Sequence, residues 1–242
     1  MKKALFVLLL SAVALMGDEA HDIMKKIDNN IRGQNIYLQM KMTITSMGHT
    51  RTMKIQTWAK GTKKSFVKTI YPPKDKGITF LSLDNQMWQY VPKIERIIKI
   101  PPSMMLQNWM GSDITNDDMV KQSSIVDDYD PRILDKEGTV VTMELTPKED
   151  AAVVWGKIIS YIDTTTYTSQ KDIFYDEDGK EVRIFYYENV KKYGPYYMPT
   201  YWKLQPVDKP NNRTEIFLEE VKYDSDISEQ YFQKSALKRF SR

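Results

Sequence analysis

The chain has 242 residues, no cysteine, and 35 lysines and arginines against 32 aspartates and glutamates. The lack of cysteine excludes disulfides, thiolate nucleophiles and thiolate metal sites, and the near balance of charges is unlike that of a nucleic-acid-binding protein. The length suits a single β domain, which can run to about 200–250 residues.

The first seventeen residues have the pattern of a secretory signal peptide. Lys2 and Lys3 precede an apolar run over residues 4–14. This run is shorter than the ~20 residues that a membrane-spanning helix needs. Cleavage after Gly17 is favoured, and cleavage after Ala20 is the alternative.

One domain over residues 18–242 is expected to follow the signal peptide. Loss of the two signal-peptide lysines leaves 33 basic and 32 acidic residues, a net charge of +1. A bacterial lipoprotein carries its lipid anchor on a cysteine, which this chain lacks. We therefore expect a soluble protein of the periplasm without a lipid anchor.

The mature chain opens with a predicted helix that ends at Gly33. Its apolar residues recur at helical spacings of three and four, namely Ala20, Ile23, Met24, Ile27 and Ile31. From residue 36 to 44 every even position is apolar, which is typical of a half-buried strand.

About a dozen strands at hairpin spacing predict an antiparallel sheet. Asp178-Gly179 is a strong hairpin signal, and Ser228 is a good N-cap for a closing helix. The expected strands are 36–44, 53–59, 65–71, 78–83, 86–91, 94–100, 139–146, 153–163, 172–175, 181–190, 197–204 and 215–223.

Residues 101–122 interrupt this rhythm, because they show neither strand alternation nor a full helix. The segment contains Trp109 and four of the fourteen methionines. Exposed apolar groups in a connecting segment need a cover, and unbranched methionines suit variable apolar partners. Two interpretations remain open, a lid over a hydrophobic cavity and a plain loop packed on the core.

Residues for catalysis are scarce. His21 and His49 have no second histidine or cysteine at ligand spacing, so no metal site is expected. Ser112 lacks the flanking glycines of a nucleophile elbow. The aspartates before Pro131 are interpreted as a solvated turn, namely Asp127, Asp128 and Asp130. We therefore expect no enzyme and no cofactor.

Several segments together resemble the bacterial outer-membrane lipoprotein-sorting family, the LolA-like carriers. The resemblance covers nearly the whole mature chain. Its most specific parts are the strand pair over 40–58, Tyr71-Pro72-Pro73-Lys74-Asp75-Lys76-Gly77, the run 88–92 followed by Arg96, and the run 109–118. The best-studied carriers have an Arg-Pro pattern where this chain has Tyr71-Pro72-Pro73. The resemblance is therefore a better basis for predicting the fold than for predicting the cargo.

The resemblance implies a mainly β protein with a few helices, an incomplete, bent antiparallel barrel of about eleven strands with a helical plug or lid. Its concave face would bind acyl chains of a lipoprotein or lipid for transfer toward the outer membrane. The face is expected to be lined by Met40, Met42, Ile44, Met53, Ile55 and Trp88. The expected lid residues are Met104, Met105, Leu106, Trp109 and Met110.

The expected partners are an inner-membrane transporter and an outer-membrane acceptor, with the carrier itself a monomer. A non-enzymatic accessory module that docks on protein is the alternative function. A second alternative, an outer-membrane barrel, is disfavoured by lysines crowding the predicted strands and their ends, among them Lys54, Lys63 and Lys191.

Overall fold

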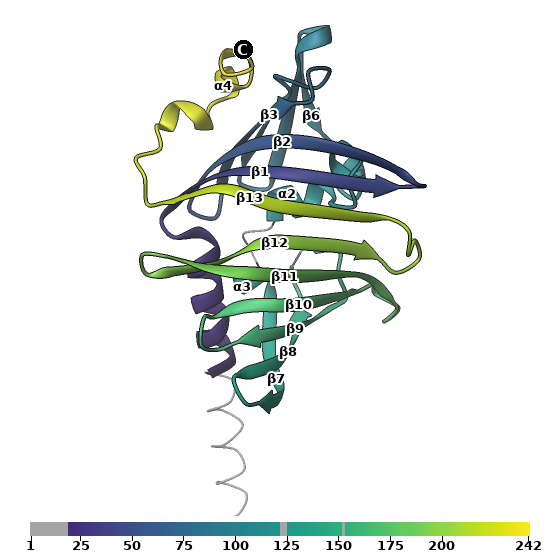
Figure 1. Ribbon diagram of the computed structural model, residues 1–242, viewed down its shortest axis with the longest axis vertical. Coiled ribbons are helices and arrows are strands. Elements are labelled where there is room, and N and C mark those ends of the chain that lie inside the picture. Colours follow the sequence, from purple (N-terminus) through teal and green to yellow (C-terminus); the bar gives the residue numbers. More distant parts are fainter. Residues whose placement is uncertain (1–18, 122–124, 152) are drawn as a thin grey trace, which may run out of the picture.

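The structure is a computed structural model that describes residues 19–121, 125–151 and 153–242. The expected signal peptide, residues 1–17, lies outside this part of the chain. The described chain begins with a helix over residues 19–32, the purple coil in Figure 1. Gly33 ends it as predicted, with a positive φ of 54° and its N–H donating to the Asn29 carbonyl at 2.8 Å.

The strands that follow form one mixed-length but wholly antiparallel sheet of thirteen strands. The first half contains β1 (Asn35–Ser46), β2 (His49–Lys60), β3 (Lys64–Tyr71), β4 (Thr79–Leu83), β5 (Gln86–Val91) and β6 (Arg96–Ile100). The second half contains β7 (Tyr129–Glu137), β8 (Val140–Pro147), β9 (Lys157–Asp163), β10 (Thr168–Tyr175), β11 (Glu181–Tyr193), β12 (Tyr196–Pro206) and β13 (Arg213–Tyr223).

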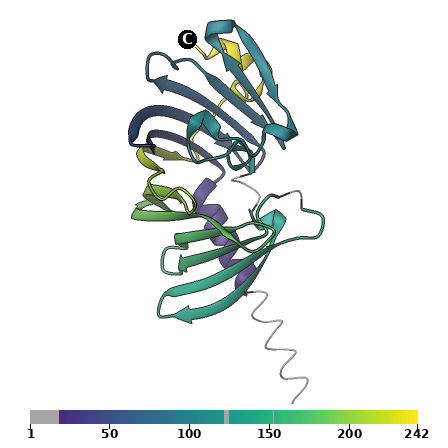
Figure 2. The same ribbon diagram turned by 90° about the vertical axis from the view of Figure 1, so that its right-hand side faces the viewer.

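The sheet grows outward from its middle in both directions. Each strand from β1 to β6 pairs with the next, and so does each strand from β7 to β13. The two halves join where β1 pairs with β13, for example at Met42 opposite Ile216. The strands β6 and β7 are therefore the two edges, and the sheet is bent and open (Figures 1 and 2).

A crossover segment connects these two edges. After the short 3-10 turn η1 (Pro92–Ile94) and β6, it contains η2 (Pro102–Met104), η3 (Trp109–Gly111), α2 (Asn116–Lys121) and α3 (Ile125–Asp128). Figure 2 shows the crossover and the N-terminal helix on the same, concave side of the sheet. The crossover covers the first half of that face, and the N-terminal helix covers the second half.

The prediction of a mainly β, antiparallel and incompletely closed fold is confirmed, but the number of strands was underestimated. The structure has thirteen strands instead of about eleven. The strand missed from the sequence is β7, because Pro131 was interpreted as part of a turn. A proline is tolerated in an edge strand, where one side needs no ladder hydrogen bonds. Asp127 and Asp128 lie in α3 and Asp130 in β7, not in a solvated turn.

The C-terminal segment covers the opposite, convex face of β3 to β5. The predicted closing helix is divided into η4 (Glu229–Phe232) and α4 (Lys234–Arg239). Ser228 caps η4 as expected, since its hydroxyl accepts a hydrogen bond from the Gln230 N–H. This outer cluster contains Phe66, Leu81, Trp88, Tyr90, Phe232 and Leu237.

Candidate functional site

A cavity of about 280 Å³ lies between the concave face of the sheet, the N-terminal helix and the crossover. It is larger than the ~150 Å³ apolar cavity that holds benzene and close to the lower end of ligand pockets, about 300 Å³. Most of its lining is apolar. The cavity is therefore a candidate site for hydrocarbon.

The central strands supply one wall of this cavity because their side chains alternate between the two faces. On β1 the even-numbered residues Ile36, Leu38, Met40 and Met42 are buried and line the cavity. Ile55 and Ala59 of β2 extend the same wall. The period of two that the sequence shows in this region thus becomes one continuous apolar surface.

The N-terminal helix and the crossover are the two covers of the concave face, and their residues form the opposite wall of the cavity. Met24, Ile27 and Ile31 reach the cavity from the N-terminal helix. Met119 and Val120 of α2 reach it from the crossover. The cavity therefore lies between the sheet on one side and these two pieces of chain on the other.

An ion pair fixes α2 to the sheet beside the cavity. The Arg183 guanidinium on β11 donates two hydrogen bonds to the Asp118 carboxylate, each 2.6 Å long. Thr115 and Asp118 also form a capping box: each side chain accepts from the other residue's N–H, at 3.1 and 2.8 Å. Burial alone would raise the pKa of Asp118, but Arg183 and Thr115 outweigh it and hold the pKa below its usual value.

Aromatic rings surround Arg183. The guanidinium carbon lies 4.1 Å from the ring centre of Trp155 and 4.5 Å from that of Phe174. Cation–π contacts of this kind are strongest where water is excluded, and only 5% of the Arg183 side chain is exposed. The same residues line the cavity, so its polar wall is held by contacts within the protein.

Asp172 on β10 is another ionisable group in the lining. Burial raises the pKa of this carboxyl, against the lowering effect of hydrogen bonds from Ser160, Tyr187 and Ser169. Burial and the neighbouring Asp172 also raise the pKa of Tyr187 well above its usual value. Burial of the two side chains is the main cause of both shifts.

Comparisons with known proteins agree with this architecture. Residues 61–239 match a protein family whose description reads "Uncharacterized protein". The chain belongs to this family. No curated protein matches the chain.

Solved structures show the fold to be LolA-like. A DUF1329 family protein from Desulfovibrio piger has a TM-score of 0.84 at 21% identity, over 92% of this chain and 99% of that chain. A putative outer membrane lipoprotein-sorting protein domain from Vibrio parahaemolyticus has a TM-score of 0.79 at 19% identity, over 92% and 100%. A LolA superfamily protein from Nitrosomonas europaea has a TM-score of 0.76 at 20% identity, over 90% and 98%. The predicted resemblance is thereby confirmed for the fold.

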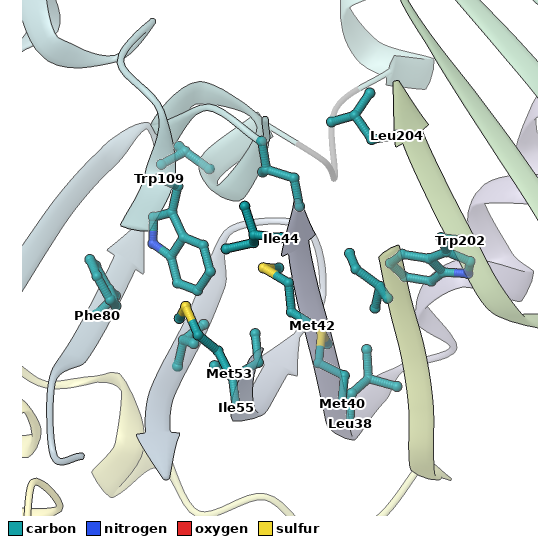
Figure 3. Close-up of a cluster of buried hydrophobic side chains, with 14 of the residues drawn as sticks. Leu38, Met40, Met42, Ile44, Met53, Ile55, Phe80, Trp109, Trp202 and Leu204 are labelled. Atoms are coloured by element: carbon teal, nitrogen blue, oxygen red, sulfur yellow. The ribbon is translucent and has the colours of Figure 1, made fainter. Parts of the chain in front are cut away.

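The residues predicted for the concave face of this LolA-like fold divide into three groups. Met40, Met42 and Ile55 line the cavity. Ile44 and Met53 are buried in the same apolar cluster but do not border the hollow. Figure 3 shows why for Met53, which lies on the side of the cluster occupied by Trp109.

The sixth residue, Trp88, lies in the outer cluster instead. It packs with Phe66 and Tyr90 under the C-terminal segment, and the Lys234 ammonium lies 4.6 Å from its ring centre. Both faces of β5 are covered, so Met87 and Trp88 are both buried although they point to opposite sides. Trp88 is therefore remote from the cavity lining.

None of the predicted lid residues lines the cavity. Trp109 is 0% exposed and packs on Phe80 with ring centres 5.2 Å apart, so it fills the first half of the concave face. Met105 and Met110 are partly buried against the same cluster. Met104 and Leu106 point outward and are 36% and 58% exposed.

Local hydrogen bonds explain this division of the segment. The Ser112 hydroxyl donates to the Trp109 carbonyl at 2.7 Å, and the Asn116 amide donates to the Met104 carbonyl at 2.9 Å. These bonds fold the segment into compact turns with Trp109 inward and its neighbour Leu106 outward. The part of the crossover that covers the cavity begins later, at Ile114.

Several lining residues were not expected from the sequence. The helical spacing of Met24, Ile27 and Ile31 marked an apolar face, but not what that face would cover. The second half of the sheet adds Phe174, Phe185 and Trp202, whose role depends on the bend of the sheet. Among the described residues, no group of three or more histidines, aspartates or glutamates is placed to hold a metal. None of the described helices has the length and apolarity to cross a membrane.

Proposed function

We propose that this protein is a non-enzymatic periplasmic carrier that binds acyl chains of a lipid or lipoprotein in the cavity. The observation that supports this proposal best is the apolar hollow between the sheet and its two covers. A LolA superfamily protein and a lipoprotein-sorting domain share the fold. The sequence pattern of the first seventeen residues supports export.

The energetics explain why such a cavity is needed. Each methylene of an acyl chain in water costs ~0.8 kcal/mol, so a whole chain costs on the order of 10 kcal/mol. A carrier offsets this cost with dry surface of its own. A cavity of about 280 Å³ has room for part of one chain, so longer or multiple chains require α2 and the N-terminal helix to separate.

In this proposal α2 is the movable cover, in place of the predicted lid residues 104–110. It lines the cavity, and one buried ion pair and its own capping box hold it in place. In this proposal α2 would move when cargo is loaded from an inner-membrane transporter. It would move again when cargo is released to an outer-membrane acceptor. The Trp109 turn would remain packed as part of the core.

The test is acyl binding by a variant with a filled cavity. Ala59 lines the hollow, and Ala59→Trp adds a large side chain there without removing any core residue. We expect this variant to bind a fluorescent fatty acid at least about tenfold more weakly than the wild type, a loss of about 1.4 kcal/mol. Thr50→Trp, at an exposed position of the same strand, is the matched control and should bind normally.

Co-purifying cargo gives an independent readout. Protein released from cells by osmotic shock and purified without detergent should yield acylated molecules in mass spectrometry of an organic extract. If the wild type carries no such molecule and has no affinity for the fluorescent fatty acid, the carrier proposal is wrong.

One observation favours the alternative of a protein-docking accessory module. Leu106 is 58% exposed and Met104 is 36% exposed on the crossover, where each adds apolar surface. Photo-crosslinking from position 106 in cells separates the two functions. A single protein adduct, together with purified protein that carries no acylated molecule, would favour the docking module.

A further inference from the structure

The cavity meets solvent at the turn between β2 and β3. Among the described residues that line it, the only exposed ones are the consecutive residues Gly61, Thr62, Lys63 and Lys64, and all the others are buried or half-buried. A residue that borders a hollow and is itself exposed lies where the hollow opens to water. We call residues 61–64 the mouth of the cavity.

The mouth lies beside the end of the N-terminal helix. The Gly61 N–H donates to the Gln34 carbonyl at 3.1 Å, which holds the turn against the residues that follow the helix. Behind the turn the lining is apolar, with Ala59 of β2, Val67 of β3 and Ile36 of β1. A polar, hydrated entrance thus leads directly into an apolar hollow.

One positive charge at the mouth has no acidic partner among the described residues. The ammonium groups of Lys60 and Lys64 both pair with the Glu229 carboxylate, at 2.7 and 3.0 Å. The Asp84 N–H donates to the Lys63 carbonyl at 2.8 Å, but the Asp84 carboxylate forms no ion pair with the Lys63 ammonium. The three lysines therefore outnumber the two carboxylates around them, and the surplus charge lies on Lys63.

A free positive charge in front of an apolar hollow suits a molecule that is apolar along its length and anionic at one end. An acyl chain gains free energy when it leaves water for the hollow, whereas a charged end is costly to bury. Because the Lys63 ammonium is exposed, an anion can pair with it at the mouth and remain hydrated.

We propose that Lys63 pairs with the anionic end, a carboxylate or a phosphate, of a lipid whose acyl chain occupies the cavity. The ligand class is thus an anionic lipid, such as a fatty acid or a phospholipid, as opposed to a neutral glyceride or alcohol. This inference rests on the proposed function, because it places the end of the same ligand at the mouth of the same cavity.

Amphiphiles that differ only at one end provide the test. Dodecanoate, monododecyl phosphate and dodecanol have carbon chains of equal length, and isothermal titration calorimetry at low salt measures the affinity of each. We expect Lys63→Met to bind both anions about threefold to fivefold more weakly than the wild type does, which is the effect of an exposed ion pair. This loss should nearly vanish in about 1 M salt, which screens exposed charges.

The affinity of Lys63→Met for dodecanol should equal that of the wild type, which also shows that the variant is folded. Lys74→Met is the matched control, since Lys74 is exposed on the turn between β3 and β4 and does not line the cavity. It loses the same charge and should bind all three amphiphiles normally. Lys63→Glu puts a negative charge at the mouth, so it should bind the anions about tenfold more weakly than the wild type and dodecanol equally well.

The outcomes separate this inference from the proposed function. A loss confined to monododecyl phosphate supports a phospholipid, and a loss for dodecanoate as well supports a fatty acid. If Lys63→Met binds the anions like the wild type, or loses dodecanol affinity to the same extent, the Lys63 site is overturned while acyl binding stands. If the wild type binds none of the three amphiphiles, the proposed function itself fails.

Discussion

The two halves of the sheet are covered in different ways on their concave side. Over β1 to β5 the crossover inserts Trp109, which is completely buried against Phe80 and the methionines of β1 and β2. Over β7 to β10 the N-terminal helix packs through residues such as Ile23 and Ile27. The first cover belongs to a turn that follows β6, and the second precedes the sheet in the chain.

The comparison shows how a single sheet acquires both a solid core and a hollow. Each cover packs well against its own half. The cavity lies between the covers, where Ile27 of the helix and Met119 of α2 face the central strands. The two covers bury much of this apolar surface, and burial of apolar surface is favourable even where the space between the covers is not filled. Variants that affect each region differently can test this division.

The largest effect is expected from Trp109→Ala. Removal of a fully buried indole from the packed half should lower the free energy of unfolding by about 3–5 kcal/mol. Urea denaturation followed by circular dichroism measures this loss. Leu106→Ala, three residues earlier and 58% exposed, is the control and should change stability by less than about 0.5 kcal/mol. Equal effects of the two variants would contradict the distinction between the packed turn and its exposed neighbour.

Asp118→Ala tests the contact that connects the crossover to the second half of the sheet. It leaves the buried Arg183 guanidinium without its carboxylate and removes half of the capping box at Thr115. We expect a loss of roughly 3 kcal/mol in the free energy of unfolding.

The pH dependence of the wild type provides a second readout for Asp118. Its pKa is depressed in the folded state, so its contribution is present above the unfolded pKa and is lost as the pH falls through the folded pKa. The difference between wild type and Asp118→Ala should therefore shrink in acid. A difference that stays constant down to low pH would mean that the ion pair is not its source.

Two isoleucines of one helix test the boundary between packed core and hollow. Ile23 and Ile27 are both buried and lie one turn apart, but only Ile27 lines the cavity. Truncation to alanine should cost about 3 kcal/mol at Ile23 and about 1 kcal/mol less at Ile27, which has fewer packed neighbours to lose. Chemical denaturation of both variants gives the difference. A greater loss at Ile27 would mean that the cavity side is the better packed one.

The sequence was sufficient to predict every strand of the sheet except β7, because strand alternation depends only on neighbouring positions. Met40 and Met42 show this, since their even-numbered register correctly placed them on a buried face. The edge strand β7 escaped detection because Pro131 normally indicates a turn, and only the edge position makes it acceptable. The error was thus one of tertiary context.

The cavity could be predicted only in part for the same reason. Met53 and Ile55 belong to one strand and one face, yet only Ile55 borders the hollow. Which buried residues meet empty space depends on where the crossover inserts Trp109, and no local pattern encodes that path. Trp88 shows a second limit, because alternation along β5 gives no information once a C-terminal segment covers the other face.

Asp172→Asn gives the smallest expected effect and tests whether the hollow excludes water. Burial raises the pKa of the Asp172 carboxyl in the folded state above its value in the unfolded chain. Between these two pKa values the folded protein holds a proton that the unfolded chain releases, so the stability of the wild type relative to the variant should increase as the pH falls through the folded pKa towards the unfolded one. Urea denaturation at pH 8 and at pH 4 measures this increase. A relative stability that is the same at both would mean that water reaches this carboxylate, and the dry cavity on which acyl binding depends would lose its support.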